Sequence, residues 1–273
     1  MARITASRGR LRREGRHVVS DRPPLGRHDH VHPRRRGDED RSTADVRRSL
    51  VIASPSFRVA ELFLSLQGEG PSAGTPACFV RLQGCDVGCH WCDTKYSWDE
   101  RGGRCLSSEA LWGEAARLGP APLLVVTGGE PLQQMGIGEL LDAALERWPR
   151  VEVETSGIGE PPRSHPRLHY NVSPKLPTAT ARWEETWTSI ASWIDEPRAT
   201  FKLVIADATD WEHARGLIER HGLPRDRVML MPEGMTESVL RERSAWLADR
   251  CKQEGLRLSP RLHVWLWGPR RGT

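Results

Sequence analysis

Apolar and polar positions from Val51 onward follow two patterns that alternate along the chain. Runs that alternate or are apolar and β-branched predict strands over residues 77–85, 122–131, 150–157, 167–175, 199–207 and 227–234. Apolar residues at helical spacing predict helices over residues 107–118, 134–147, 209–221 and 236–254, the first capped by Ser107 or Ser108. Strands that alternate with helices indicate a parallel sheet with helical crossovers. At this length we predict an α/β fold, a compact partial (β/α) barrel.

Three segments depart from these patterns. Residues 57–71 are apolar and then turn at two glycines, Gly68 and Gly70. Residues 176–198, rich in Trp, Thr and Pro, predict a long loop with room for one helix. The sequence RLHVWLWG, residues 261–268, closes the last element of the chain.

Residues 1–50 have a different character from the rest of the chain. They contain 14 Arg, no Lys and 7 acidic residues, a net charge of +7, whereas residues 51–273 carry −3. Their composition cannot bury a core, so we predict a disordered Arg-rich extension before a catalytic domain over residues 51–273. Two alternatives stay open: an incorrectly assigned start site, and a basic arm that binds nucleic acid.

The composition excludes several classes of protein. No run approaches the roughly 20 apolar residues that a membrane span needs. The N-terminus lacks the apolar stretch of a secretory signal, and six cysteines in a chain of 273 residues do not suggest a disulfide scaffold. We therefore expect a cytoplasmic protein.

Half of the cysteines lie in the sequence GCDVGCHWCDT, at Cys85, Cys89 and Cys92. Their spacing would fit one face of a helix, but the two glycines among them and the preceding strand argue against a helix. A zinc site would need a fourth ligand, and apart from His90 no ligand lies at zinc-ribbon spacing. Iron–sulfur clusters are bound by thiolates, usually four, and three would leave one iron open.

An open iron can chelate the amino group and carboxylate of S-adenosylmethionine. The CxxxCxxC spacing of residues 85–92 resembles the signature of the radical SAM superfamily in full. The sequence VVTGGEP, residues 125–131, is similar to that superfamily's second hallmark, a Gly-Gly-Glu-Pro loop that contacts the methionine end of the cofactor. The two motifs together are far more specific than either alone, since a strand ending in Gly-Gly is by itself ordinary turn chemistry.

Further motifs narrow the resemblance to one family. They are SLQGEG (65–70), FVRLQGC (79–85), CDT (92–94), TGGEP (127–131), ETSG (154–157), SPK (173–175) and FKLV (201–204), with RLHVWLWG at the end. From residue 57 to the end, the chain resembles the 7-carboxy-7-deazaguanine synthases. The resemblance implies a modified, compact barrel of the radical SAM type and does not cover residues 1–50.

The resemblance also implies roles for individual residues. The [4Fe-4S] cluster would be held by Cys85, Cys89 and Cys92. Contacts to S-adenosylmethionine are implied for Trp91, Cys92, Asp93, Gly129, Ser173, Pro174, Lys175, Phe201, Lys202, Leu203 and Val204. Contacts to the substrate are implied for Leu66, Gln67, Gly68, Glu69, Arg81 and Thr127, with the guanidinium of Arg81 suited to a substrate carboxylate. Thr94 would supply one hydroxyl to Mg²⁺, a metal that keeps waters and takes further ligands from substrates.

Each of these polar side chains also has a purely structural explanation. Arg81 and Lys175 would then lie on a solvated face. Gln67 and Glu69 would be turn residues between glycines, and Thr94 would cap a turn.

The implied reaction is that of a carbon–nitrogen lyase. A 5′-deoxyadenosyl radical removes hydrogen from C6 of 6-carboxy-5,6,7,8-tetrahydropterin, the ring contracts, and ammonia leaves, on the route to queuosine and other 7-deazapurines. The implied partners are an electron donor such as flavodoxin or ferredoxin and a second copy of the chain; no membrane or nucleic acid is expected. Two alternatives remain: another small radical SAM enzyme, such as a glycyl-radical activating enzyme, and a zinc module that binds nucleic acid.

Overall fold

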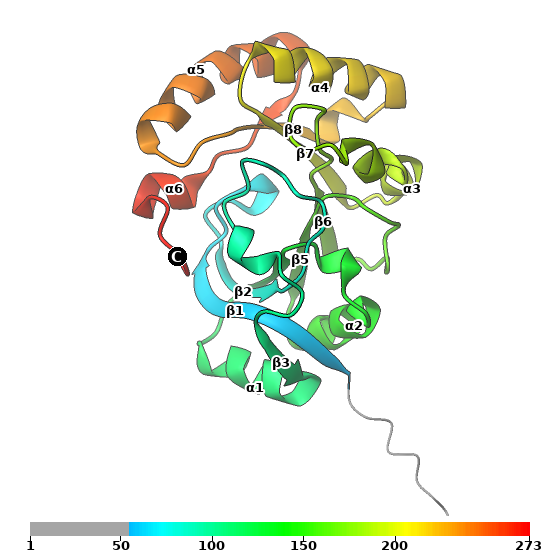
Figure 1. Cartoon of the computed structure of the whole chain (residues 1–273), viewed down its shortest axis with the longest axis vertical. Helices are drawn as coiled ribbons and strands as arrows, with labels where there is room; N and C mark the ends of the chain where they lie inside the picture. The colour runs from blue at the N-terminus through cyan, green and yellow to red at the C-terminus, as the bar shows by residue number, and fades with distance from the viewer. Residues whose placement is uncertain (1–54) are drawn as a thin grey trace, which may run out of the picture. The chain divides into compact units, whose positions relative to one another are not determined.

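The structure, a computed structural model, describes residues 55–273, which are built around one curved sheet of nine strands (Figure 1). The strands are β1 Ser56–Leu66, β2 Pro76–Leu82, β3 Arg104–Ser107, β4 Leu123–Gly128, β5 Arg150–Thr155, β6 Leu168–Val172, β7 Ala199–Ile205, β8 Val228–Pro232 and β9 Arg257–Leu258. The predicted extension over residues 1–50 lies outside the described residues.

The strand order is β3-β1-β2-β4-β5-β6-β7-β8-β9. Every neighbouring pair from β2 to β9 is parallel, whereas β1 runs antiparallel to both β2 and β3. Among the described residues no ladder joins β3 to β9, so the sheet curves without closing. The prediction of a partial (β/α) barrel is therefore confirmed.

The α-helices are α1 Ser108–Arg117, α2 Ile137–Arg147, α3 Ile190–Asp195, α4 Ala208–His221, α5 Glu237–Glu254 and α6 Leu262–Trp267. The first five cover the outer face of the sheet, whereas α6 takes no part in the core on that face (Figure 1). The main apolar core fills the space between α1–α5 and the sheet. Ser107 caps α1 as predicted, because its hydroxyl accepts a hydrogen bond from the Ala110 N–H at 3.2 Å. Among residues 55–273, no helix combines the length and apolar character that a bilayer crossing requires.

Successive side chains along a strand point to opposite faces of the sheet, one toward the apolar core and the other toward the inside of the barrel. On β7, Phe201 and Leu203 point into the apolar core, whereas Lys202 and Val204 line a cavity on the inner face. On β2, Val80 belongs to the core and Arg81 to the cavity. The inner face of the barrel therefore carries the polar groups, at the carboxyl ends of the parallel strands.

Four short elements were not predicted from the sequence: β3, β9, the 3-10 turn Trp183–Trp187 and α6. Strands β3 and β9 have four and two residues, too short for a pattern to reveal. The segment 176–198 contains one α-helix, α3, as expected, preceded by the 3-10 turn Trp183–Trp187. The closing sequence forms helix α6.

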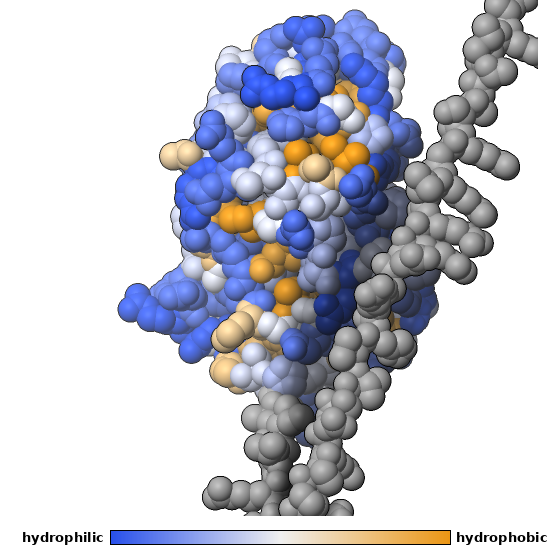
Figure 2. Space-filling view, turned by 90° about the vertical axis from the view of Figure 1, so that its right-hand side faces the viewer, coloured by the Kyte–Doolittle hydropathy of each residue, from blue (hydrophilic) through white to orange (hydrophobic). Residues whose placement is uncertain are grey.

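The face shown in Figure 2 is mostly hydrophilic, and its hydrophobic side chains lie in separate small areas.

Candidate active site

A cavity of about 240 Å³ opens at the carboxyl ends of the strands. It brings together most of the residues that the sequence singled out: Leu66, Gln67, Gly68, Glu69, Arg81, Cys85, Cys89, Trp91, Cys92, Asp93, Thr94, Thr127, Gly129, Ser173, Lys175, Lys202 and Val204. Three others, Pro174, Phe201 and Leu203, do not line it. The side chains of the last two face the core because strand residues alternate between faces.

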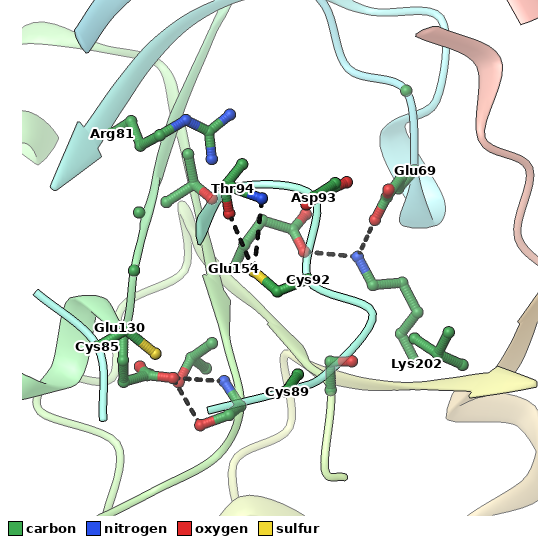
Figure 3. A pocket seen from close by; sticks show the side chains of 18 of the residues that line it. Glu69, Arg81, Cys85, Cys89, Cys92, Asp93, Thr94, Glu130, Glu154 and Lys202 are labelled. Atoms are coloured by element: carbon green, nitrogen blue, oxygen red, sulfur yellow. Dashed lines mark hydrogen bonds and ion pairs between the residues drawn. The ribbon is translucent and has the colours of Figure 1, made fainter. Parts of the chain in front are cut away.

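The three cysteines lie on a loop after β2 that contains no helix, so the helix-face interpretation is wrong. The loop is held by its main chain: the N–H groups of Gly84 and Cys85 donate to the carbonyls of Ser97 and Trp98, at 2.7 and 3.1 Å. All three thiols are free and line the same cavity (Figure 3). The loop therefore presents its sulfur atoms while its backbone fixes its shape.

Burial raises the pKa of the Cys85 thiol to about 11 and also raises the pKa of the Cys89 thiol, against the nearby charge of Lys175. Ligation requires thiolates, so binding of iron would release protons here. Within residues 55–273, no three His, Cys, Asp or Glu side chains converge as the ligands of one metal ion would. In an iron–sulfur cluster each thiolate binds a different iron, so the three sulfur atoms need not approach one point. The three cysteines, which line one cavity, fit that requirement.

The second motif lies against the cysteine loop. A Cβ on Gly129 would come 2.1 Å from the carbonyl oxygen of Gly84, so only glycine permits this approach. The carboxylate of Glu130 accepts hydrogen bonds from the hydroxyls of Thr155 and Ser156, both at 2.6 Å, and from the Ser156 N–H at 2.7 Å. Residues 84–92 and 128–131 together form what we call the cluster wall of the cavity.

The opposite side of the cavity is built from buried charges (Figure 3). Nζ of Lys202 donates to Glu69 at 2.5 Å and to Glu154 at 2.7 Å. Burial alone would raise the pKa of Glu69, but the charges of Lys202 and Arg261 outweigh it and hold that pKa well below its usual range. At Glu154 burial prevails over the attraction of Lys202, and the pKa of that carboxyl is raised. We call Glu69, Glu154, Lys202 and Arg261 the charged wall.

Three residues that line this region, Glu154, Arg261 and His263, were given no role by the sequence. Arg261 is buried and donates to Glu69 at 3.1 Å, to the Gly234 carbonyl at 2.6 Å and to Asp93. His263 packs where a side chain on Gly68 would stand, since a Cβ there would be 2.1 Å from its Nδ1. Arg261 and His263 lie in the closing segment RLHVWLWG, where they are the only polar side chains. Nothing in the local sequence indicates that Arg261 pairs with Glu69 and Asp93.

Arg81 and Thr94 occupy the rim between the two walls. Nε of Arg81 donates to Glu61 at 2.7 Å, and its guanidinium lies 5.8 Å from the centre of the Phe63 ring. Thr94 lies beside the cluster wall, with its N–H donating to Sγ of Cys92 at 3.4 Å. A guanidinium and a hydroxyl thus face the space in front of the cysteines.

Comparisons with known proteins agree with this site. Residues 79–162 match the model of the radical SAM superfamily. The 7-carboxy-7-deazaguanine synthase of Pyrobaculum aerophilum is 41% identical over 224 residues, which cover 81% of this chain and 99% of that protein. The synthase of the same name from Hyperthermus butylicus is 36% identical, covering 80% of this chain and 96% of that protein.

The chain belongs to the 7-carboxy-7-deazaguanine synthase family. Its fold matches the crystal structure of QueE from Escherichia coli with a TM-score of 0.56 at 29% identity, covering 75% of this chain and 93% of that one. Membership in the 7-carboxy-7-deazaguanine synthase family decides against the two alternatives, a glycyl-radical activating enzyme and a zinc module. As a radical SAM enzyme, this synthase-family member uses S-adenosylmethionine, a [4Fe-4S] cluster and a reductant.

Proposed function

We propose that the protein converts 6-carboxy-5,6,7,8-tetrahydropterin to 7-carboxy-7-deazaguanine and ammonia. Product and ammonia together contain all the atoms of the substrate, so the reaction needs no net oxidant. The observation that carries the proposal is one cavity with three free thiols on one wall and Arg81, Thr94 and the charged wall around the rest. The cofactor, S-adenosylmethionine, and the substrate, 6-carboxytetrahydropterin, would lie next to each other in this cavity.

When bound, the cluster and S-adenosylmethionine supply a 5′-deoxyadenosyl radical, and the chain's own residues supply position. Cys85, Cys89 and Cys92 would hold the cluster. The cofactor would be bound by the cluster wall, by Ser173 and Lys175, and by the carboxyl end of β7. Because Phe201 and Leu203 face the core, their contribution would come from main-chain atoms, as would that of Pro174.

The substrate would lie across the charged wall. Residues 66–69 and Thr127 would contact the pterin ring, whose amide and amino groups match the carboxylates and the ammonium of that wall. Gln67 is oriented for this by donating its amide to Glu154 at 3.0 Å. The charged wall thus fixes which edge of the ring faces inward.

The substrate carboxylate would be held by two groups at the rim. Arg81 would pair with it directly, since a guanidinium suits a carboxylate. Thr94 would give one hydroxyl to a Mg²⁺ ion that the carboxylate also binds, because Mg²⁺ commonly combines few protein ligands with waters and substrate oxygens. Together they would set the position of C6.

The proposal extends to partners and place. We propose a flavodoxin or ferredoxin as the reductant, a homodimer as the working form, a cytoplasmic location, and no nucleic-acid partner. The reductant and the homodimer are what the family resemblance implies, and the location and the absence of a nucleic-acid partner are the expectations drawn from the sequence.

The test is turnover by anaerobically reconstituted protein. We expect 7-carboxy-7-deazaguanine to form from 6-carboxytetrahydropterin, faster with Mg²⁺ than without. Thr94→Ala should weaken that Mg²⁺ dependence while leaving iron content and cleavage of S-adenosylmethionine unchanged. If wild-type protein with a full cluster forms no such product, the substrate assignment is wrong, although membership in the superfamily stands.

A further inference from the structure

Glu61 on β1 joins three segments that border the cavity. Its carboxylate accepts hydrogen bonds from Nε of Arg81 on β2 at 2.7 Å, from the Tyr96 hydroxyl at 2.5 Å, and from Nε of Arg271 near the C-terminus at 3.0 Å. Tyr96 lies two residues after Thr94. The carboxylate therefore connects a strand, the exit of the cysteine loop and the end of the chain.

A bulge in β1 places Glu61 where it can do this. Val59 pairs with Leu82 and Glu61 with Arg81, so Ala60 has no partner in the ladder. In a regular strand Glu61 would share the face of Val59, which is buried in the apolar core. The extra residue reverses the alternation and turns the carboxylate to the cavity face. The bulge thus keeps the carboxylate out of the apolar core and places it beside Arg81.

The contact with Glu61 determines how Arg81 meets the cavity. Because Nε is engaged, the fork of the guanidinium can turn only a little, and the two Nη groups make no hydrogen bond within residues 55–273. Both side chains of the pair are largely buried, 15% exposed for Arg81 and 14% for Glu61. Fixing a long side chain before a ligand arrives removes an entropic cost of binding. Arg81 thus presents a preoriented, unoccupied fork.

The C-terminal residues are held at the same point. The guanidinium of Arg271 stacks on the Tyr96 ring, 3.8 Å from its centre, while its Nε reaches Glu61. Thr273, two residues later, lines the cavity. Figure 1 shows the C-terminus beside β1. Burial opposes the negative charge of Glu61, but hydrogen bonds from Tyr96 and Arg81 prevail and lower the pKa of this carboxyl.

We propose that Glu61 is a positioning residue that orients Arg81 toward the substrate carboxylate and, through Arg271, keeps the C-terminal segment against the cavity. This inference rests on the proposed function for the identity of the carboxylate. It assigns no chemistry to Glu61 itself, which acts through Arg81.

The test separates positioning from simple stabilisation. Glu61→Gln keeps the shape but removes the charge, and its KM for the pterin should rise about tenfold, the scale of one charge-assisted hydrogen bond. Its kcat should change less than about threefold, because the reacting centre is untouched. Glu114→Gln is the control, since it removes the charge from an equally close pair between Glu114 on α1 and Arg104 on β3, outside the cavity, and its KM should not change.

A double-mutant cycle gives the second readout. If Glu61 acts through Arg81, Glu61→Gln should have little further effect on KM once Arg81→Ala is present. Effects that multiply would overturn the proposal, as would a KM for Glu61→Gln within twofold of wild type.

Hydrogen exchange of residues 268–273 tests the C-terminal contact without turnover, so it remains informative if the proposed substrate proves wrong. Exchange should quicken in Glu61→Gln and Arg271→Ala and stay unchanged in Glu114→Gln. Unchanged exchange in the first two variants would refute the contact. Tyr96→Phe, which removes a single hydroxyl, serves if Glu61→Gln does not fold.

Discussion

The two walls of the cavity are built by different means. The cluster wall is held by main-chain hydrogen bonds, such as those from Gly84 N–H to the Ser97 carbonyl at 2.7 Å and from Glu130 N–H to the Gly84 carbonyl at 2.8 Å. The charged wall is held by side chains, with Lys202 and Arg261 each joining acidic residues from different elements. On the cluster wall the backbone does most of the holding, whereas on the charged wall the charged side chains hold one another.

The difference fits what each wall is proposed to bind. Thiolates that ligate iron can accept N–H hydrogen bonds, as Sγ of Cys92 does from the Thr94 N–H, but they have no proton to donate, so most of the bonds that shape that loop come from its backbone. Charges that meet a polar heterocycle can be shared with neighbouring charges, and must be, because an unpaired buried charge is strongly destabilising. Substitutions on the cluster wall should therefore reduce activity with little loss of stability. Substitutions on the charged wall should reduce both.

The largest effect on activity is expected on the cluster wall. Cys89→Ala should lose the cluster and all turnover, yet change the free energy of unfolding of the iron-free protein by about 1 kcal/mol or less. Iron and sulfide content, visible absorbance and urea unfolding measure the two effects. Cys251→Ala, in a buried position of α5, is the control and should load iron normally. Normal loading of Cys89→Ala would show that the cysteine is no ligand.

The largest effect on stability is expected on the charged wall. Lys202→Met leaves Glu69 and Glu154 facing each other in a buried place and should lower the free energy of unfolding by about 3–5 kcal/mol. Lys252→Met removes an exposed ion pair with Asp249 and should cost less than about 1 kcal/mol. Urea unfolding at pH 7 compares the two. Equal costs would mean that the charged wall is not held by its ion pairs.

A third comparison uses two glycines. Gly129→Ala would press its Cβ against the Gly84 carbonyl, so we expect S-adenosylmethionine to bind at least about tenfold more weakly to the reconstituted protein, since close approach demands glycine here. Gly113→Ala, on α1 with open space around it, should instead stabilise the protein by about 0.5–1 kcal/mol. Calorimetric titration and thermal unfolding measure the two. Unchanged cofactor binding in Gly129→Ala would count against this contact.

The smallest expected effect concerns pH. Burial lowers the pKa of His263. The charges of Arg261 and Lys202 lower this pKa further, and those of Glu69 and Asp93 only partly offset the effect. As pH falls through about 6.5, the unfolded chain takes up a proton before the folded chain does, so stability falls, by less than about 1.4 kcal/mol per pH unit. His263→Gln should show a shallower loss between pH 7.5 and 5.5 in urea unfolding. Parallel curves for the two proteins would contradict this.

Sequence patterns reveal the parts of this site that are local. The cysteine loop and the glycine loop are each a few residues long, and the strands that carry them show their alternation plainly. The bulge also left a trace, because the core positions step by two from Phe57 to Val59 and then by three to Leu62. Side chains alternate between the two faces of a strand, so the sequence of β7 could likewise have shown that Lys202 lies on the opposite face from Phe201 and Leu203.

Contacts between distant segments could not be found in this way. Glu69 and Arg261 are 192 residues apart, and their pairing depends on how the sheet curves. The same holds for Glu61 and Arg271, separated by 210 residues. No local pattern encodes such a partner, because each side chain taken alone fits a solvated surface equally well.

The short edge strands have a consequence for self-association. An open sheet has two edges, and each offers unpaired backbone groups to another chain. Among residues 55–273 those edges are β3, with four residues, and β9, with two. A second copy that extended the sheet would therefore form few backbone hydrogen bonds along either edge. Copies of this protein would therefore associate through helices and loops, and not by strand-to-strand polymerisation.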